Sequence, residues 1–153
     1  MIYFTCKAQD LTTIETSRVR WLECAADYAL AKDYWKARGT ELAHDTWTKA
    51  HEYGYQYAAI IEDGRIVSSA GVLRFSEACW EVAAVGTLED FRRRGYARSV
   101  VAFVTAYILN AGLLATCSTS DDNEAMTATA KSVGFQVIPK DEVWWKYPNL
   151  PDF

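Results

Sequence analysis

Three consecutive arginines, Arg92, Arg93 and Arg94, run directly into Gly95 in a chain whose formal net charge is −4. A hydrophobic segment precedes this stretch, and a segment with helical spacing of apolar residues follows it. The first turn of a helix exposes backbone N–H groups at the positive end of the helix dipole, and a glycine lets a ligand approach that backbone closely. The pattern predicts an anion site, and a phosphate group fits it best.

Two other interpretations of the arginines are a solvated basic loop and a nucleic-acid-binding patch. The acidic balance of the chain argues against nucleic-acid binding, which needs a basic face. The sequence contains no G-K-[S/T] Walker loop and no G-x-G-x-x-G motif, so the two common alternative phosphate motifs are absent. The phosphate site is therefore favoured over both.

Hydrophobic periodicity predicts the elements that must position this site. The Asp63-Gly64 pair is a strong hairpin signal and places a three-strand meander in the middle of the chain. The order predicts a single-domain mixed α/β sheet, an antiparallel meander plus a parallel strand pair, with helices on both faces. The predicted elements are a strand (2–6), two helices (17–38 and 41–53), the meander (55–61, 65–75 and 78–85), a helix (96–110), a strand (113–118), a helix (124–133), a strand (135–138), and a last strand or aromatic docking segment (143–147).

The length of 153 residues predicts one domain, residues 1–153, and an apolar half of the composition is enough to fill a core. The N-terminus lacks a basic region followed by a long apolar run, and no apolar stretch is long enough to span a bilayer. We therefore expect a cytoplasmic protein that does not bind membranes.

The cysteines and histidines do not predict a metal site. The four cysteines are widely spaced and form no C-x-x-C pair, which indicates free thiols. His44 and His51 are seven residues apart, and no Glu or Cys completes a metal-binding set beside either. Trp21, Tyr28 and Trp35 form an aromatic stripe on the first predicted helix, and packing in the core is favoured over a substrate cleft.

The sequence resembles a known family at the arginine stretch. Residues 92–97, Arg-Arg-Arg-Gly-Tyr-Ala, fit the [Q/R]-x-x-G-x-[G/A] pattern of the GNAT superfamily of N-acetyltransferases. The strand before the motif, the helix after it, and a downstream Asn123…Gly134-Phe135 similar to the family's "N…GF" segment extend the resemblance over about residues 55–138. The six-residue motif is modestly specific, and the combination is highly specific.

The resemblance implies that the chain binds acetyl-CoA as co-substrate. Main-chain amides of residues 93–97 would hold the pyrophosphate, Val85 and Thr87 would pair by backbone with the pantetheine arm, and Asn123 would contact that arm from the other side. Side chains of the arginines would add charge against the phosphates. The implied cofactor-binding residues are Val85, Thr87, Arg92, Arg93, Arg94, Gly95, Tyr96, Ala97, Arg98 and Asn123.

Glu81 is the candidate general base that would deprotonate the acceptor amine. It lies eleven residues before Arg92, which resembles the spacing of the catalytic glutamate in histone acetyltransferases of this superfamily. A carboxylate within an apolar strand has a raised pKa, which suits a base. Strand alternation predicts that Glu81 shares a face with Ala83 and Val85, and a solvent-facing glutamate is an equally weighted alternative.

The sequence departs from the family where many members carry a tyrosine that protonates the leaving thiolate. That position is Ala130 here, as in some bacterial branches of the family. The candidates to protonate the thiolate in place of the tyrosine are Thr129, Cys117, Ser118 or a water. Alternatively, the thiolate leaves without a proton donor. Cys117 as an acyl-carrying nucleophile is disfavoured against direct transfer.

The predicted function is N-acetylation of a primary amine, a small molecule or a peptide, by direct transfer from acetyl-CoA. The acidic composition mildly favours a cationic acceptor, and the N-terminal helices would carry the acceptor site by analogy with the family. The alternative is a non-catalytic acyl-CoA-binding sensor or partner module. The sequence leaves open whether the protein forms a homodimer.

Overall fold

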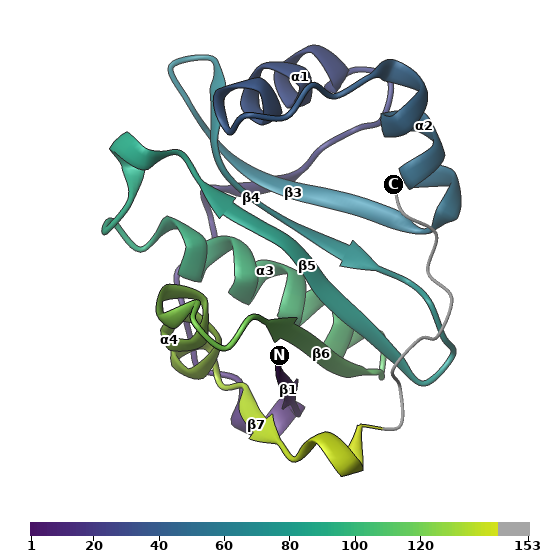
Figure 1. Cartoon of the computed structure of the whole chain (residues 1–153), viewed down its shortest axis with the longest axis vertical. Coiled ribbons are helices and arrows are strands. Elements are labelled where there is room, and N and C mark those ends of the chain that lie inside the picture. The colour runs from purple at the N-terminus through teal and green to yellow at the C-terminus, as the bar shows by residue number, and fades with distance from the viewer. Residues whose placement is uncertain (144–153) are drawn as a thin grey trace.

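The computed structural model describes residues 1–143, which form one seven-stranded sheet in the order β2-β3-β4-β5-β6-β1-β7 (Figure 1). Neighbouring strands are antiparallel except for the pair β5 and β6, which is parallel. The mixed α/β sheet predicted from the sequence is confirmed. The strands are β1 (Ile2–Cys6), β2 (Val19–Trp21), β3 (Tyr55–Glu62), β4 (Arg65–Leu73), β5 (Cys79–Thr87), β6 (Leu114–Thr119) and β7 (Gln136–Ile138).

Helices cover both faces of the sheet (Figure 1). Tyr57 of β3 meets Trp35 and Trp47 from the first two helices, and Trp80 of β5 stacks on Tyr107 of the third. Tyr57 is in register with Gly71 of β4 and, through it, with Ala83 of β5, so these three residues share one face of the sheet. Trp80 is an odd number of residues from Ala83 and therefore points to the other face, so the first two helices and the third lie on opposite faces. The helices are α1 (Tyr28–Ala37), α2 (His44–Tyr53), α3 (Tyr96–Asn110) and α4 (Glu124–Val133), and short 3₁₀ turns span Ala8–Asp10, Glu89–Phe91 and Lys140–Glu142.

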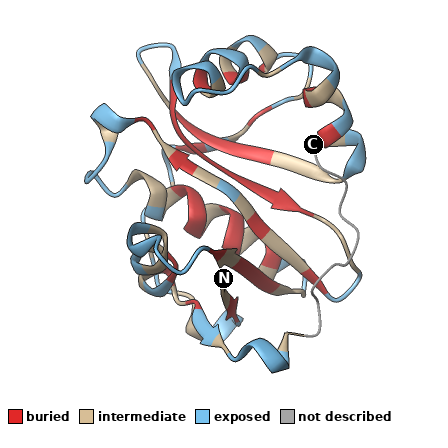
Figure 2. Ribbon diagram, in the orientation of Figure 1, coloured by how far each residue is buried: buried red, intermediate tan, exposed pale blue. Residues whose placement is uncertain are grey.

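The core lies between the sheet and its helices. Figure 2 shows the buried residues concentrated along the central strands and on the side of α3 that faces the sheet. Val100, Val101, Val104 and Ile108 of α3 are fully buried, at the i, i+1, i+4 and i+8 spacing that a helix packed on a sheet requires. This packing fixes the axis of α3, and therefore the direction in which its N-terminus points.

The helix predicted over residues 17–38 is wrong in its first half. Val19–Trp21 forms the edge strand β2, which pairs with β3, and the helix α1 begins only at Tyr28. The aromatic stripe is therefore not a helix face, because Trp21 packs edge-on against Phe103 and Tyr107 of α3. Three residues are too few to show whether the apolar residues repeat with the period of a strand or of a helix. The segment is a strand because it pairs with β3.

The other boundaries differ by smaller amounts. Helix α2 begins at His44 instead of Glu41, with Ala43 as an N-cap that makes no side-chain bond. The predicted hairpin turn is confirmed: Asp63 and Gly64 both have positive φ, 52° and 76°, as a two-residue turn between antiparallel strands requires. Trp144, Trp145 and Tyr147 of the predicted last segment lie outside the described residues.

Candidate active site

The arginine stretch forms the loop that leads into α3. Gly95 is the N-cap of α3 at φ 79°, and no side chain caps the helix. Arg93 also has a positive φ, 63°, so two left-handed residues curl the backbone immediately before the helix. Such a turn aims successive N–H groups at one point, where they add to the positive end of the helix dipole. A Cβ placed on Gly95 would meet nothing within 4 Å, so the space beside it is open.

A cavity of about 810 Å³ lies beside this loop, between β5 and α4. All four of its charged lining residues are arginines, in an acidic protein. Nine of the ten residues implied by the resemblance line it: Val85, Thr87, Arg92, Arg93, Gly95, Tyr96, Ala97, Arg98 and Asn123. The cavity therefore combines exposed helix N–H groups with positive charge, which is the chemistry of an anion site.

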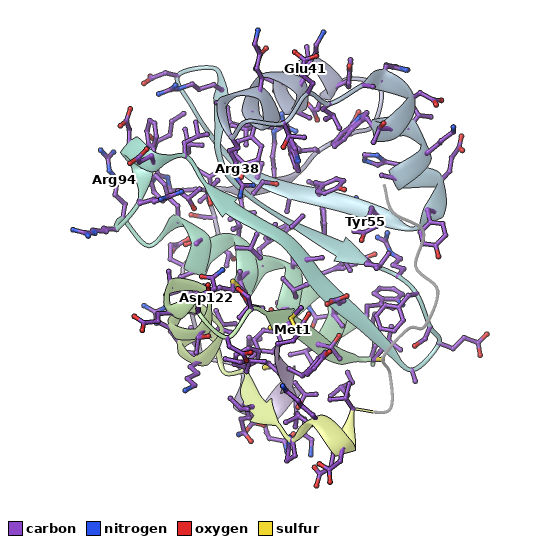
Figure 3. All side chains as sticks on the ribbon, viewed as in Figure 1. Met1, Arg38, Glu41, Tyr55, Arg94 and Asp122 are labelled. Atoms are coloured by element: carbon purple, nitrogen blue, oxygen red, sulfur yellow. The ribbon has the colours of Figure 1, made fainter. Side chains whose placement is uncertain are left out.

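Arg94 is the residue of that set that does not line the cavity. Its guanidinium lies over the ring of Phe91, 5.1 Å from the centroid, and Arg65 lies over the same ring at 5.0 Å. Figure 3 shows the Arg94 side chain projecting away from the body of the molecule. In this position the guanidinium points away from the cavity, which leaves the backbone of Arg94 as its part of the loop.

Tyr96 ties the loop to the β3–β4 hairpin. Its hydroxyl donates a hydrogen bond to Glu62 and accepts one from Arg18 at 3.2 Å, while Arg18 and Glu62 form an ion pair. The first residue of α3 is thereby connected to strand β3 and to the segment before β2. These contacts reduce the number of conformations open to the loop before any ligand binds.

Strands β5 and β6 separate beside the cavity. They pair only from Cys79 to Glu81, opposite Leu114 to Thr116, although β5 continues to Thr87. Beyond Glu81 the edge of β5 that faces β6 has no strand partner in the described part of the chain. Its backbone groups are available to an extended ligand that adds itself as a strand.

A bulge in β5 accompanies this separation. Ser69 pairs with Gly86 and Gly71 pairs with Ala83, so Ala84 and Val85 oppose the single residue Ala70. Ala84 has φ 51°, which is unusual for a residue other than glycine and marks local strain. The bulge bends β5 away from β6.

The bulge also corrects the alternation predicted for Glu81. Glu81 and Ala83 share the face that carries α1 and α2. Val85 lies on the α3 face instead. It is two residues before Thr87 and therefore shares its face, and the Thr87 hydroxyl is hydrogen-bonded to that of Ser68 on the α3 side. The prediction that Glu81 and Val85 share a side is therefore wrong, since one extra residue reverses the alternation.

Glu81 stands at the last paired position before the strands separate, and its side chain is half-buried. Burial raises the pKa of its carboxyl group above the ordinary value, and the hydrogen bond donated by Ser118 Oγ at 3.3 Å opposes this rise. Burial raises the pKa of Tyr55 and of Cys117, and the nearby charge of Glu81 adds to both rises. A solvent-facing glutamate does not describe this environment.

The residues proposed to protonate the leaving thiolate differ in their burial and in their access to the cavity. Ala130 is 0% exposed in the core and does not line the cavity, whereas Thr129, the preceding residue, does. Cys117 is 1% exposed and burial raises its pKa, so it is a poor nucleophile and a poor thiolate. Ser118 is engaged with Glu81. Thr129 is therefore the candidate with direct access to the cavity.

Two parts of the cavity wall were not found from the sequence. One is the rest of the α4 face on which the candidate Thr129 lies, namely Ala125, Ala128 and Ser132, whose spacing with Thr129 (i, i+3, i+4, i+7) and small side chains were a detectable signal. The other is Arg38, at the C-terminal end of α1. No local signal identifies Arg38, because it lies about fifty residues before the arginine stretch.

Within residues 1–143, no cluster of three or more His, Cys, Asp or Glu side chains is placed to hold a metal ion. The helices of the same described region are all too short or too polar to cross a bilayer.

Comparison with known proteins identifies the family. Residues 16–135 match the model of the Acetyltransferase (GNAT) family, which is more than half of the chain. The chain belongs to this family. No curated protein sequence matches it.

Solved structures share the fold. A putative acetyltransferase of the GNAT family from Novosphingobium aromaticivorans has a TM-score of 0.73 at 22% identity, over 90% of this chain and 59% of that one. A GNAT-family acetyltransferase from Colwellia psychrerythraea has a TM-score of 0.73 at 15% identity, over 89% and 52%. This chain thus spans little more than half the length of those two proteins.

A third structure is more similar in length. The aminoglycoside N-acetyltransferase AAC(6')-Iy, solved in complex with CoA, has a TM-score of 0.61 at 17% identity, over 77% of this chain and 90% of that one. The same enzyme was also solved with a bisubstrate analogue that joins CoA to an acetylneamine.

Proposed function

We propose that this protein is an acetyl-CoA-dependent N-acetyltransferase that acts on a primary amine by direct transfer. The observation that carries the proposal is the unpaired edge of β5, which begins at half-buried Glu81 and ends at Thr87 in the wall of the arginine-rich cavity; Glu81 itself does not line that cavity. From Glu81 to Thr87 the strand spans roughly 20 Å at about 3.3 Å per residue. A long extended ligand with phosphates at one end and a reactive group at the other matches this layout.

The residues present fit the phosphate part of CoA. The curled backbone around Arg93 and Gly95, together with the uncapped N-terminus of α3, supplies N–H donors. Arg92, Arg93 and Arg98 supply positive charge without a carboxylate among the cavity's lining residues. The open edge of β5 at Val85 and Thr87 would pair with the pantetheine amides. Asn123 lines the opposite wall, with its Oδ1 already accepting the Met126 amide.

When bound, acetyl-CoA supplies the acetyl thioester. Glu81 would accept a proton from the acceptor amine, directly or through a water, so that the neutral nitrogen attacks the thioester carbonyl. After the attack the nitrogen would give up its second proton, the C–S bond would break, and that proton would pass to the thiolate, directly or through water, to give free CoA. Thr129, which lines the cavity, would relay the proton or orient the water that carries it.

The acceptor would approach from the face of the sheet that carries α1 and α2, because Glu81 lies on that face. The aromatic side chains on this face are packed in the core, since Tyr57 is 8% and Trp47 1% exposed, so the carboxylate of Glu81 is the feature that attracts a ligand. A cationic amine is attracted by a carboxylate. We therefore keep a cationic primary amine as the proposed acceptor class.

Release of free thiol tests the proposal. The protein is incubated with acetyl-CoA and pools of amines, including polyamines, aminoglycosides and lysine derivatives, and CoA formation is followed with a thiol reagent. We expect amine-dependent release that is lost in Glu81→Gln. Tight CoA binding without turnover on any pool would favour the non-catalytic acyl-CoA-binding module, which the absence of a tyrosine at position 130 suggested.

A further inference from the structure

Arg38 enters the cofactor cleft from the half of the molecule that the resemblance assigns to the acceptor. It is the C-cap residue of α1, and its exposed side chain lines the same cavity as the arginine loop. Figure 3 places Arg38 over the end of strand β5. The other charged lining residues all come from the loop and the first turn of α3, so Arg38 is the charged lining residue that comes from a separate element.

The guanidinium lies against the backbone of β5 at Gly86. A Cβ on Gly86 would lie 2.2 Å from Arg38 Cζ, which is far inside van der Waals contact. The absence of a side chain at position 86 therefore creates the space that the guanidinium occupies. Tyr34 holds it from the other side, accepting a hydrogen bond from Nη1 at 3.3 Å and presenting its ring at 5.5 Å.

The partners of Arg38 are neutral. Among the described residues, no carboxylate lies within ion-pair distance of its guanidinium. Tyr34 contributes one hydroxyl and a ring, and a guanidinium has five N–H donors. Positive charge and donor capacity therefore remain for a ligand in the cleft.

The position along β5 indicates which part of the ligand Arg38 meets. Gly86 is adjacent to Thr87, whose carbonyl accepts a hydrogen bond from Arg92 Nε at 3.4 Å. The guanidinium groups of Arg38 and Arg92 thus lie beside consecutive residues of one strand. Glu81 is five residues away, roughly 15 Å at about 3.3 Å per residue. Arg38 is therefore at the anion end of the cleft and not at the reacting end.

We propose that Arg38 binds a phosphoryl group of CoA, so that the phosphates are held both by the end of α1 and by the N-terminus of α3. The proposal rests on the proposed function, because it assumes that CoA occupies the cleft. It adds a cofactor contact supplied by the acceptor half of the fold. CoA binding would then also fix the end of α1 against β5.

Binding measurements by calorimetry test it. We expect Arg38→Ala to weaken CoA binding about tenfold, the effect of losing one hydrogen bond to a charged group. Lys36→Ala is the matched control, because Lys36 is an exposed cation on the same turn of α1 that does not line the cavity, and it should bind as the wild type does. Arg38→Lys keeps the charge without the planar group and should lose less than Arg38→Ala.

Binding of dephospho-CoA, which lacks the 3′-phosphate, shows which phosphoryl group Arg38 contacts. A tenfold loss with both ligands assigns Arg38 to the pyrophosphate, and a loss with CoA alone assigns it to the 3′-phosphate. In either case the loss should shrink between about 50 and about 500 mM salt, because salt screens an exposed charge contact. A loss of the same size at both salt concentrations would overturn the proposal in favour of a neutral contact with the pantetheine arm.

Gly86→Ala tests the geometry independently. The new Cβ must displace the guanidinium, so this variant should also weaken CoA binding, and its effect should largely vanish in an Arg38→Ala background. Thermal unfolding checks that each variant is folded. Unchanged CoA affinity in folded Arg38→Ala overturns the role of Arg38 alone, whereas a wild-type protein that does not bind CoA overturns the proposed function.

Discussion

The two ends of the unpaired edge of β5 are built differently. At the end near Thr87, here called the outer end, most of the positive charge comes from one short stretch of chain, residues 92–98. At the end near Glu81, here called the apex, the neighbours of the carboxylate come from three different strands. The outer end relies on backbone geometry and positive charge. The apex relies on burial, on a single hydrogen bond from Ser118, and on the bulge that separates β5 from β6. The outer end can therefore be read as a motif, while the apex exists only after the sheet has assembled.

The two ends should also respond differently to mutation. Changes at the outer end should alter the affinity for CoA, and changes at the apex should alter turnover at saturating CoA. Variants at each end test this difference.

The largest effect is expected for Gly95→Val. A β-branched residue at φ 79° is strained, and its side chain would project into the open space beside the loop. We expect CoA affinity to fall by more than about 100-fold, or about 2.8 kcal/mol, by calorimetry. Gly112→Val is the control, because Gly112 at the other end of α3 has the same φ of 79° and the same open space. Equal loss of affinity in both variants would show that strain, and not the site, is responsible.

Glu81→Gln should lower kcat by about 100-fold or more, the usual contribution of a general base, and leave CoA affinity unchanged. The measurement is thiol release at saturating CoA. Unchanged turnover would remove Glu81 from the mechanism.

The same variant carries a test of the burial of Glu81. The folded-state pKa is raised above the unfolded value, so the ionised carboxylate costs stability near pH 7, and this cost is absent below about pH 4, where both states are protonated. We expect Glu81→Gln to raise the midpoint of thermal unfolding at pH 7 but not at pH 4. A lower midpoint at pH 7 would contradict the half-buried, raised-pKa environment.

Arg93→Ala and Arg94→Ala should differ although the residues are adjacent. Arg93 lines the cavity, so its loss should weaken CoA binding by about threefold, the modest effect of an exposed charge. The side chain of Arg94 lies on Phe91, and its loss should change CoA affinity by less than about twofold. A loss in Arg93→Ala as large as that in Gly95→Val would mean that charge, and not backbone, dominates the outer end.

Ser118→Ala should have the smallest effect, a change in pH dependence. Ser118 donates to Glu81 and lowers its pKa, so removing the hydroxyl should raise that pKa further. The acidic limb of the kcat profile should then move to higher pH, with little change on the plateau. A limb that does not move would show that Glu81 is not the group whose ionisation the profile reports.

Local patterns predicted most of the elements correctly. The meander, its Asp63-Gly64 turn and the α3 helix with its glycine N-cap depend on residues that are neighbours in sequence, so the pattern contains the interaction. The segment 17–27 was predicted wrongly, because Val19–Trp21 becomes a strand only through pairing with β3, about forty residues further along the chain.

The site divides in the same way. The sequence predicted the anion loop from residue types at fixed spacing, and it named Glu81 through the family resemblance. The face of Glu81, the absence of Arg94 from the cavity and the presence of Arg38 in it follow only from how the strands and helices pack. The physical reason is that a one-residue bulge reverses a strand's alternation, and a side chain from α1 meets β5 only when both are packed on one sheet.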